Sequence, residues 1–89
     1  MSFGRRLRFA RKEKRITLAE LEERAGVTKV SLNRYEKHGY EPTLRVAIRL
    51  AAALGMSLDE LAQDEIAEER RETERETSKR VSRETDAEA

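Results

Sequence analysis

A glycine inside a run of helical periodicity is the feature that most constrains this chain. In the segment ELEERAGVTKVSLNRYE, residues 20–36, apolar side chains recur at helical spacing on both sides of Gly26. Glycine is unfavourable inside a helix, but it suits the left-handed residue that ends one. Thr28 follows two positions later, where its hydroxyl can cap a new helix. The segment therefore predicts two helices that meet at a corner.

Helix starts elsewhere in the chain carry the same kind of signal. Capping-box patterns begin at TLAE, residues 17–20, and at SLDE, residues 57–60, and Thr43 precedes a further apolar run. Together with an amphipathic N-terminal segment, these signals predict five short helices in a compact all-α domain over residues 1–62. The side chains predicted to face inward are Phe3, Leu7, Ala10, Leu18, Leu21, Ala25, Leu32, Tyr35, Leu44, Ala47, Ile48, Ala51, Leu54, Leu58 and Leu61.

Charge divides the chain into a basic body and an acidic tail. Residues 1–62 hold 13 Lys/Arg and 8 Asp/Glu, a net charge of +5, whereas residues 63–89 hold 6 and 10, a net charge of −4. The tail has only Ile66 and Val81 as large apolar residues, but it lacks helix breakers. We expect residues 63–89 to be a charged tail that is either a helical extension or disordered, with disorder beyond about residue 80. The basic body indicates nucleic-acid binding.

Several functional classes find no support in the composition. The absence of cysteine removes disulfides and thiolate zinc sites, and no apolar run approaches the roughly 18 residues of a membrane span. The N-terminus MSFGRRLRFARK lacks the apolar core of a secretory signal. No phosphate-binding loop, catalytic set or cluster of metal ligands is present. We expect a non-enzyme without metal or cofactor, located in the cytoplasm.

About residues 3–62 resemble the Cro/repressor-type helix-turn-helix domain. The resemblance is carried by LRFARKEKRIT, TLAELEERAGVTKVSLNRYE, EPT and LAAALGMSLDEL, in this order and spacing. The family is the lambda-repressor-like, xenobiotic-response-element group of bacterial and phage regulators. It implies a five-helix domain with the helix-turn-helix at about residues 17–38. It also implies a sequence-specific transcriptional regulator, more often a repressor, that binds double-stranded DNA as a homodimer.

The resemblance further implies which residues meet the DNA. Residues 28–37 would be the recognition helix in the major groove, where Asn33 can pair with adenine and Arg34 with guanine. The implied base contacts are Lys29, Val30, Asn33 and Arg34. The implied phosphate contacts are Thr17, Thr28, Lys37, Tyr40 and Thr43. Arg11 and Glu36 match a structural salt bridge between the first and third helices of some members.

Two positions depart from the family pattern. Leu18 stands where many members carry a glutamine that holds a phosphate. This puts one anchoring contact in doubt, although Thr17 and the N–H groups at the start of the helix could partly replace it. Glu22 stands where the family prefers a small residue, usually alanine, at the contact between the second and third helices. A glutamate there must bend out to solvent or pair with a cation such as Lys29, because burying it unpaired would cost several kcal/mol.

Two other functions are compatible with the same sequence. The first is an antitoxin-type protein, in which the domain binds DNA and the charged tail binds a partner toxin. The second is a helix-turn-helix used only for protein contacts, which the residues at positions 18 and 22 mildly favour and the basic body disfavours. Independently of these two functions, Lys29, Asn33 and Arg34 could each be part of an ordinary solvated face.

Overall fold

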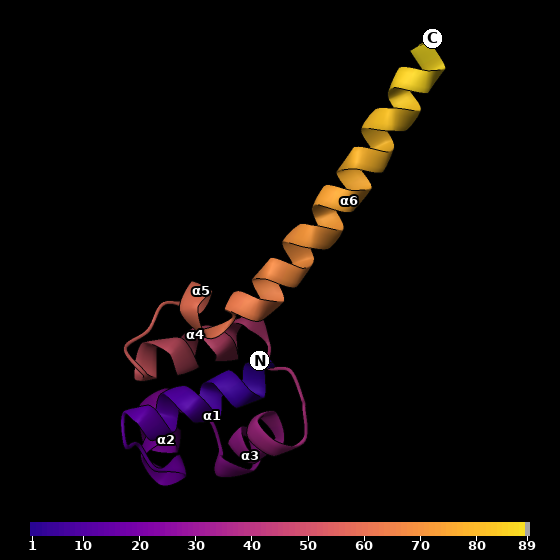
Figure 1. Ribbon diagram of the computed structural model, residues 1–89. Coiled ribbons are helices and arrows are strands. Elements are labelled where there is room, and N and C mark those ends of the chain that lie inside the picture. Colours follow the sequence, from indigo (N-terminus) through magenta and orange to yellow (C-terminus); the bar gives the residue numbers. More distant parts are fainter. Residues whose placement is uncertain (89) are drawn as a thin grey trace.

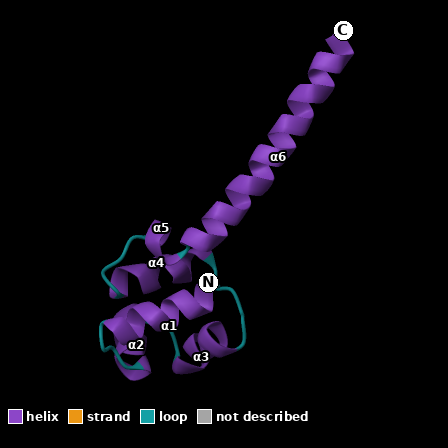
Figure 2. Cartoon of the chain, viewed as in Figure 1, coloured by secondary structure: helices purple, strands orange, loops and turns teal. Residues whose placement is uncertain are grey.

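The computed structural model describes residues 1–88, with side chains through residue 77, as six helices without a strand (Figures 1 and 2). The predicted all-α class is therefore confirmed. The helices are α1 (Phe3–Glu13), α2 (Leu18–Ala25), α3 (Lys29–Lys37), α4 (Leu44–Ala53), α5 (Leu58–Leu61) and α6 (Gln63–Glu88). Helices α1 to α5 form the body, and α6 projects from it (Figure 1).

Leucines from all five helices of the body fill the core. Helix α1 packs against α3 and α5, α2 packs against α3 and α4, and α4 packs against α5. Burying a leucine side chain completely contributes about 2 kcal/mol to the stability of the fold. Detaching any helix of the body would therefore expose apolar surface and cost a large part of that stability. The leucines that are almost completely buried are Leu7, Leu21, Leu32, Leu50, Leu54 and Leu61.

The predicted buried face of α4 is wrong at two positions. Leu44 is 67 % exposed and Ile48 is 49 % exposed, whereas Leu50, which was not predicted to face inward, is completely buried. The segment LRVAIRLAAA is apolar around most of its circumference, so two stripes at helical spacing are available in it. Packing against α2 and α5 selects the stripe that runs from Ala47 through Leu50 to Leu54.

Helices α1 and α3 approach each other closely at Gly4. A Cβ atom added to Gly4 would lie 1.9 Å from the backbone oxygen of Tyr35. Only glycine fits at this crossing, because any side chain would push the two helices apart. The position of α3, which carries the candidate site, therefore depends on a backbone contact with α1.

The tail begins as a separate helix and does not simply extend α5. Ala62 has φ −105° and ψ 23°, which ends the four-residue helix α5 and redirects the chain before α6. The backbone of α6 is helical through Glu88, as in the helical alternative for the tail. Disorder was expected beyond about residue 80. Side chains in that segment lie outside the described part of the structure. In the described part of the chain, no helix is both long and apolar enough to cross a membrane.

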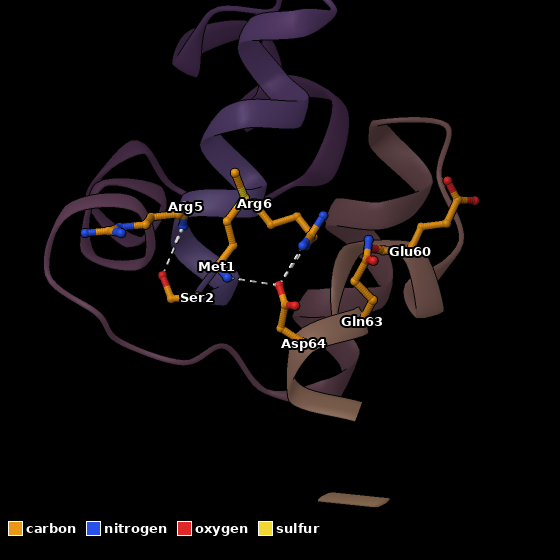
Figure 3. A network of polar contacts seen from close by, with 7 residues as sticks. All are labelled: Met1, Ser2, Arg5, Arg6, Glu60, Gln63 and Asp64. Atoms are coloured by element: carbon orange, nitrogen blue, oxygen red, sulfur yellow. Dashed lines mark hydrogen bonds and ion pairs between the residues drawn. The ribbon is translucent and has the colours of Figure 1, made fainter. Parts of the chain in front are cut away.

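An ion-pair network fastens the start of α6 to α1 (Figure 3). Arg6 donates from Nε and Nη2 to Oδ2 of Asp64, at 3.2 and 2.6 Å, and the amino group of Met1 lies 3.5 Å from the same oxygen. The hydrogen bond from Arg6 is the main cause that lowers the pKa of Asp64, against a smaller opposing effect of burial. Beyond this anchor, α6 extends away from the body, and the molecule measures 62 × 22 × 20 Å.

Candidate nucleic-acid interface

The corner between α2 and α3 is built by Gly26, Val27 and Thr28. Gly26 has φ 68° and ψ 30°, a left-handed conformation that glycine adopts without steric cost, and its N–H donates to the carbonyl of Glu22 at 2.9 Å. Val27 is buried beneath the turn. Thr28 then caps α3, because its Oγ1 accepts from the N–H of Ser31 at 3.2 Å. The segment thus folds as two helices, as the sequence predicts.

Helix α3 buries one face and exposes the face predicted to read DNA. Leu32 is completely buried, and Tyr35 is half-buried against the core. Val30 is 62 % exposed. An open hollow of about 520 Å³ follows this outer face into the next loop. Its lining residues are Val30, Asn33, Arg34, His38 and Tyr40.

This hollow brings together four of the predicted DNA contacts and omits the others. Lys29 and Lys37 are exposed at the two ends of α3, outside the hollow. His38 is a member that the sequence did not predict, because a histidine in a turn has no pattern that links it to the helix before it. The hollow combines apolar, amide and cationic groups, the types that contact thymine methyls, adenine and guanine.

The loop after α3 folds back onto the helix through Tyr40. The N–H of Tyr40 donates to the carbonyl of Arg34 at 3.3 Å. The guanidinium carbon of Arg34 lies 5.8 Å from the centre of the Tyr40 ring. This is within the range of a cation–π interaction, so the ring restricts where the guanidinium can point.

The three threonines predicted to contact phosphates differ in what their hydroxyls already bind. Thr17 accepts from the N–H of Glu20 at 3.1 Å and donates to the carboxylate of Glu20 at 3.2 Å. The expected capping box at α2 is therefore only half formed, since Glu20 reaches the hydroxyl of Thr17 and not its N–H. Thr28 donates to the hydroxyl of Ser31 at 3.0 Å. Thr43 accepts from the N–H of Val46 at 3.3 Å, and within the described side chains its hydroxyl proton remains available to a phosphate.

A bidentate ion pair fixes α3 to α1. Nε and Nη2 of Arg11 donate to the two carboxylate oxygens of Glu36, each at 2.9 Å. The remaining Nη1 donates to the carbonyl of Ile16 at 2.9 Å. Both side chains are largely buried, with exposures of 11 % and 2 %. The pair therefore holds α3 in a fixed orientation against α1.

The two departures from the family pattern have different structural outcomes. Leu18 is half-buried and packs against the core, so it replaces a phosphate anchor with an apolar contact. Glu22 is also half-buried, yet it makes no ion pair with Lys29 among the described side chains. Neither of its carboxylate oxygens is a shielded, unpartnered atom, so the group reaches solvent. Glu22 thus bends out to solvent, as the first of the two expectations has it, and does not pair with Lys29.

Comparison with known proteins identifies this arrangement. Residues 7–61, which span α1 to α5, match the helix-turn-helix family HTH_3. The chain is 31% identical over 65 residues to the immunity repressor protein of Bacillus phage phi105, covering 73% of this chain and 45% of that protein. It is 47% identical over 49 residues to an uncharacterized HTH-type transcriptional regulator of Methanothermobacter thermautotrophicus, covering 55% of this chain and 71% of that protein. The chain thus spans less than half the length of the phage repressor. It belongs to the Cro/repressor-type helix-turn-helix family of DNA-binding, non-enzymatic transcriptional regulators.

Proposed function

We propose that this chain represses transcription as a homodimer that places two copies of α3 in successive major grooves of an operator. The observation that carries the proposal is the hollow on the outer face of α3, where Val30, Asn33, Arg34 and Tyr40 lie together. The Arg11–Glu36 pair and the close crossing at Gly4 hold this face rigidly on the body. A preorganised face loses less entropy when it binds.

The side chains of the hollow and its surroundings divide into two roles. Asn33 and Arg34 carry amide and guanidinium groups that match adenine and guanine, Val30 matches a thymine methyl, and Lys29 adds a base or phosphate contact at the start of α3. The residues that hold the DNA backbone are Thr17, Thr28, Lys37, Tyr40 and Thr43. Of the threonines, Thr43 contributes most, because its hydroxyl proton is the one available to a phosphate.

Repression would follow from occupancy of the operator. A dimer that covers two half-sites, about 34–36 Å apart, blocks the DNA beneath it to polymerase. The name of the phage relative, an immunity repressor, supports this direction of control. The site of action would be the nucleoid in the cytoplasm.

Selection of bound sequences from a random DNA pool tests this function. We expect an enriched palindrome, bound with an affinity that falls steeply as salt rises. Arg34→Ala should weaken binding to the selected operator by roughly tenfold or more and relax the preference at one base pair of each half-site. The matched control is Arg70→Ala, which removes the same charge from an exposed position on α6. If Arg34→Ala binds both the operator and random DNA as the wild type does, the assignment of Arg34 as a base contact is refuted.

A second function is favoured by the position of α6. This helix projects from the body, and α5 is the element against which it packs most (Figure 1). An acidic helix in this position is accessible to another protein, as an antitoxin-type role requires. Removal of residues 71–89 keeps the Arg6–Asp64 ion pair. It should leave operator affinity unchanged, because the outer face of α3 is intact. Loss of operator affinity would show that the tail belongs to the DNA-binding function, and would exclude a role confined to a partner protein.

A further inference from the structure

The outer side of α1 carries a stripe of exposed cations around an aromatic ring. Arg5, Arg8 and Lys12 are exposed, and the side chain of Phe9 among them is 55 % exposed. At 3.6 residues per turn these four positions share one side of the helix, opposite the buried Leu7. We call these four residues the α1 stripe. Among the described side chains, no carboxylate makes an ion pair with its three cations, so their charge is not balanced within that part of the chain.

Helix α6 carries carboxylates at the same spacing. Residues 63–77 hold seven Asp/Glu and three Lys/Arg, a net charge of −4. Glu69, Glu72 and Glu76 are exposed and repeat the spacing of the three cations of the α1 stripe. Thr73 takes the position that the aromatic ring has in that stripe. We call Glu69, Glu72, Thr73 and Glu76 the α6 stripe. Both stripes are about 10 Å long, because a helix rises about 1.5 Å per residue.

The α6 stripe of a chain does not reach the α1 stripe of the same chain. The Arg6–Asp64 ion pair fixes the start of α6 at α1, and α6 then extends away from the body (Figure 1). Arg5 points away from this ion pair, so the α1 stripe lies on a different side of α1 (Figure 3). Among the described side chains, no cation makes an ion pair with Glu69 or Glu72. Both stripes are therefore accessible to another molecule.

We propose that the α1 stripe of one copy binds the α6 stripe of a second copy. The equal spacing lets three cations face three carboxylates whichever way the two helices run, with Arg8 and Glu72 as the middle pair. Thr73 is small and lines an open hollow of about 580 Å³ on α6, which leaves room for the ring of Phe9. Exposed ion pairs are individually weak, so this association depends on several of them together and weakens as salt rises.

The contact leaves the outer face of α3 free. Helix α1 meets α3 through Gly4 and Arg11, which lie outside the α1 stripe. Because the two stripes are different surfaces, one copy can bind one neighbour through α1 and another through α6. The contact therefore joins copies beyond the pair that occupies one operator. It forms without DNA, so it does not depend on the proposed function.

Sedimentation equilibrium of the full chain without DNA, at low and at high salt, provides the first test. The wild type should form assemblies larger than a dimer at low salt, and these should dissociate as salt rises. Arg8→Glu and Glu72→Arg should each weaken the association by roughly fivefold or more, because like charges then meet at the middle of the contact. Since both residues are exposed, the variants should keep the helical signal and the melting temperature.

The matched controls are Arg24→Glu and Glu23→Arg, which make the same charge changes at exposed positions of α2. They should associate as the wild type does. Association that is equally strong in Arg8→Glu, Glu72→Arg and the wild type would overturn the proposal.

An equimolar mixture of Arg8→Glu and Glu72→Arg separates this contact from a general effect of charge. In the mixture, the altered α1 stripe of one variant can meet the altered α6 stripe of the other, and the unaltered stripes can meet each other. Opposite charges then face each other again, so the mixture should associate at close to wild-type strength. The double variant R8E/E72R should do the same by itself. A mixture that associates as weakly as either variant alone would overturn the proposal.

DNA binding by the same variants distinguishes a different occupant of the α1 stripe. Arg8→Glu should bind an isolated operator no more weakly than its control Arg24→Glu does, because neither residue lies on the outer face of α3. If Arg8→Glu instead weakens binding to random DNA more than the control does and leaves self-association intact, the α1 stripe meets nucleic acid and the proposal is overturned. A wild-type chain that has no preference among DNA sequences, while the charge variants associate as expected, would refute the proposed function alone.

Discussion

The guanidinium of Arg34 lies over the ring of Tyr40, with its central carbon 5.8 Å from the ring centre. Arginine has the longest path of rotatable bonds among the side chains of the hollow, so its freedom is the largest cost of forming a base contact. The ring reduces that freedom before DNA arrives. We therefore expect Tyr40 to position Arg34, in addition to the phosphate contact proposed for it.

Replacing Tyr40 separates these two roles. Tyr40→Ala should weaken operator binding by roughly two- to fivefold, since an exposed cation–π contact is worth about 0.5–1 kcal/mol. The loss should concentrate at the base pair that Arg34 reads. Tyr40→Phe keeps the ring and should keep that preference, because only the hydroxyl is lost. Competition binding against operators changed at single positions measures both. If Tyr40→Phe and Tyr40→Ala both lose the same affinity for every operator sequence, Tyr40 acts only as a phosphate contact.

The Arg11–Glu36 pair should be strongly coupled in stability. Glu36→Gln leaves the guanidinium of Arg11 without its charge partner in a largely buried site, and we expect a loss of about 3 kcal/mol in the free energy of unfolding. The double variant Arg11→Met/Glu36→Leu removes both charges and should lose far less. Urea denaturation of the wild type, the single variant and the double variant measures the difference. Equal losses in the single and double variants would show that the apolar stems, and not the charges, stabilise the contact.

The corner and the caps could be predicted because their signals are local. Gly26 is the residue that a left-handed helix end favours, and the side chains of Thr28, Thr43 and Ser57 each accept from the backbone N–H three residues later. Such interactions depend on neighbours in the chain, so a short segment contains all the information. The fold class followed from these local signals.

Features that depend on tertiary packing were not predictable in the same way. The buried face of α4 depends on where α2 and α5 lie, and the contact of Arg34 with Tyr40 depends on how the loop after α3 turns back. The break at Ala62 has no glycine or proline to mark it. Each of these results from contacts between segments, which periodicity along one segment does not contain.

Gly4→Ala should destabilise the fold although alanine is the better helix former. The new Cβ would lie 1.9 Å from the oxygen of Tyr35, and backbone atoms can separate only if α1 and α3 move apart. We expect a loss of about 2 kcal/mol or more, in spite of a gain of about 1 kcal/mol in helix propensity. The reverse exchange at an exposed position of α2, Ala19→Gly, should cost about 1 kcal/mol and serves as the reference. Thermal melting that shows a more stable Gly4→Ala chain would contradict the close crossing.

Glu22→Ala tests the corner at its least usual residue. Since the carboxylate of Glu22 reaches solvent and is not an unpartnered buried atom, its removal should change the free energy of unfolding by no more than about 0.5 kcal/mol. Operator affinity should also be unchanged, because the outer face of α3 is untouched. Stabilisation by more than about 2 kcal/mol would show instead that the glutamate strains the corner. Chemical denaturation and operator titration of the same samples give both quantities.

The attachment of α6 to α1 should weaken in acid. The pKa of Asp64 is lowered from its ordinary value of 3.8, chiefly by the hydrogen bond from Arg6, so the folded state favours the ionised carboxylate. The resulting stability is complete above the unfolded pKa and is lost as the pH falls through the lower, folded pKa. Asp64→Asn should therefore lower the melting temperature near pH 6, and its difference from the wild type should shrink towards about pH 3. Glu69→Gln, which removes an exposed carboxylate from the same helix, is the control and should not reproduce this convergence. A difference between Asp64→Asn and the wild type that stays constant over this range would mean that the asparagine acts through packing and not through the lost charge.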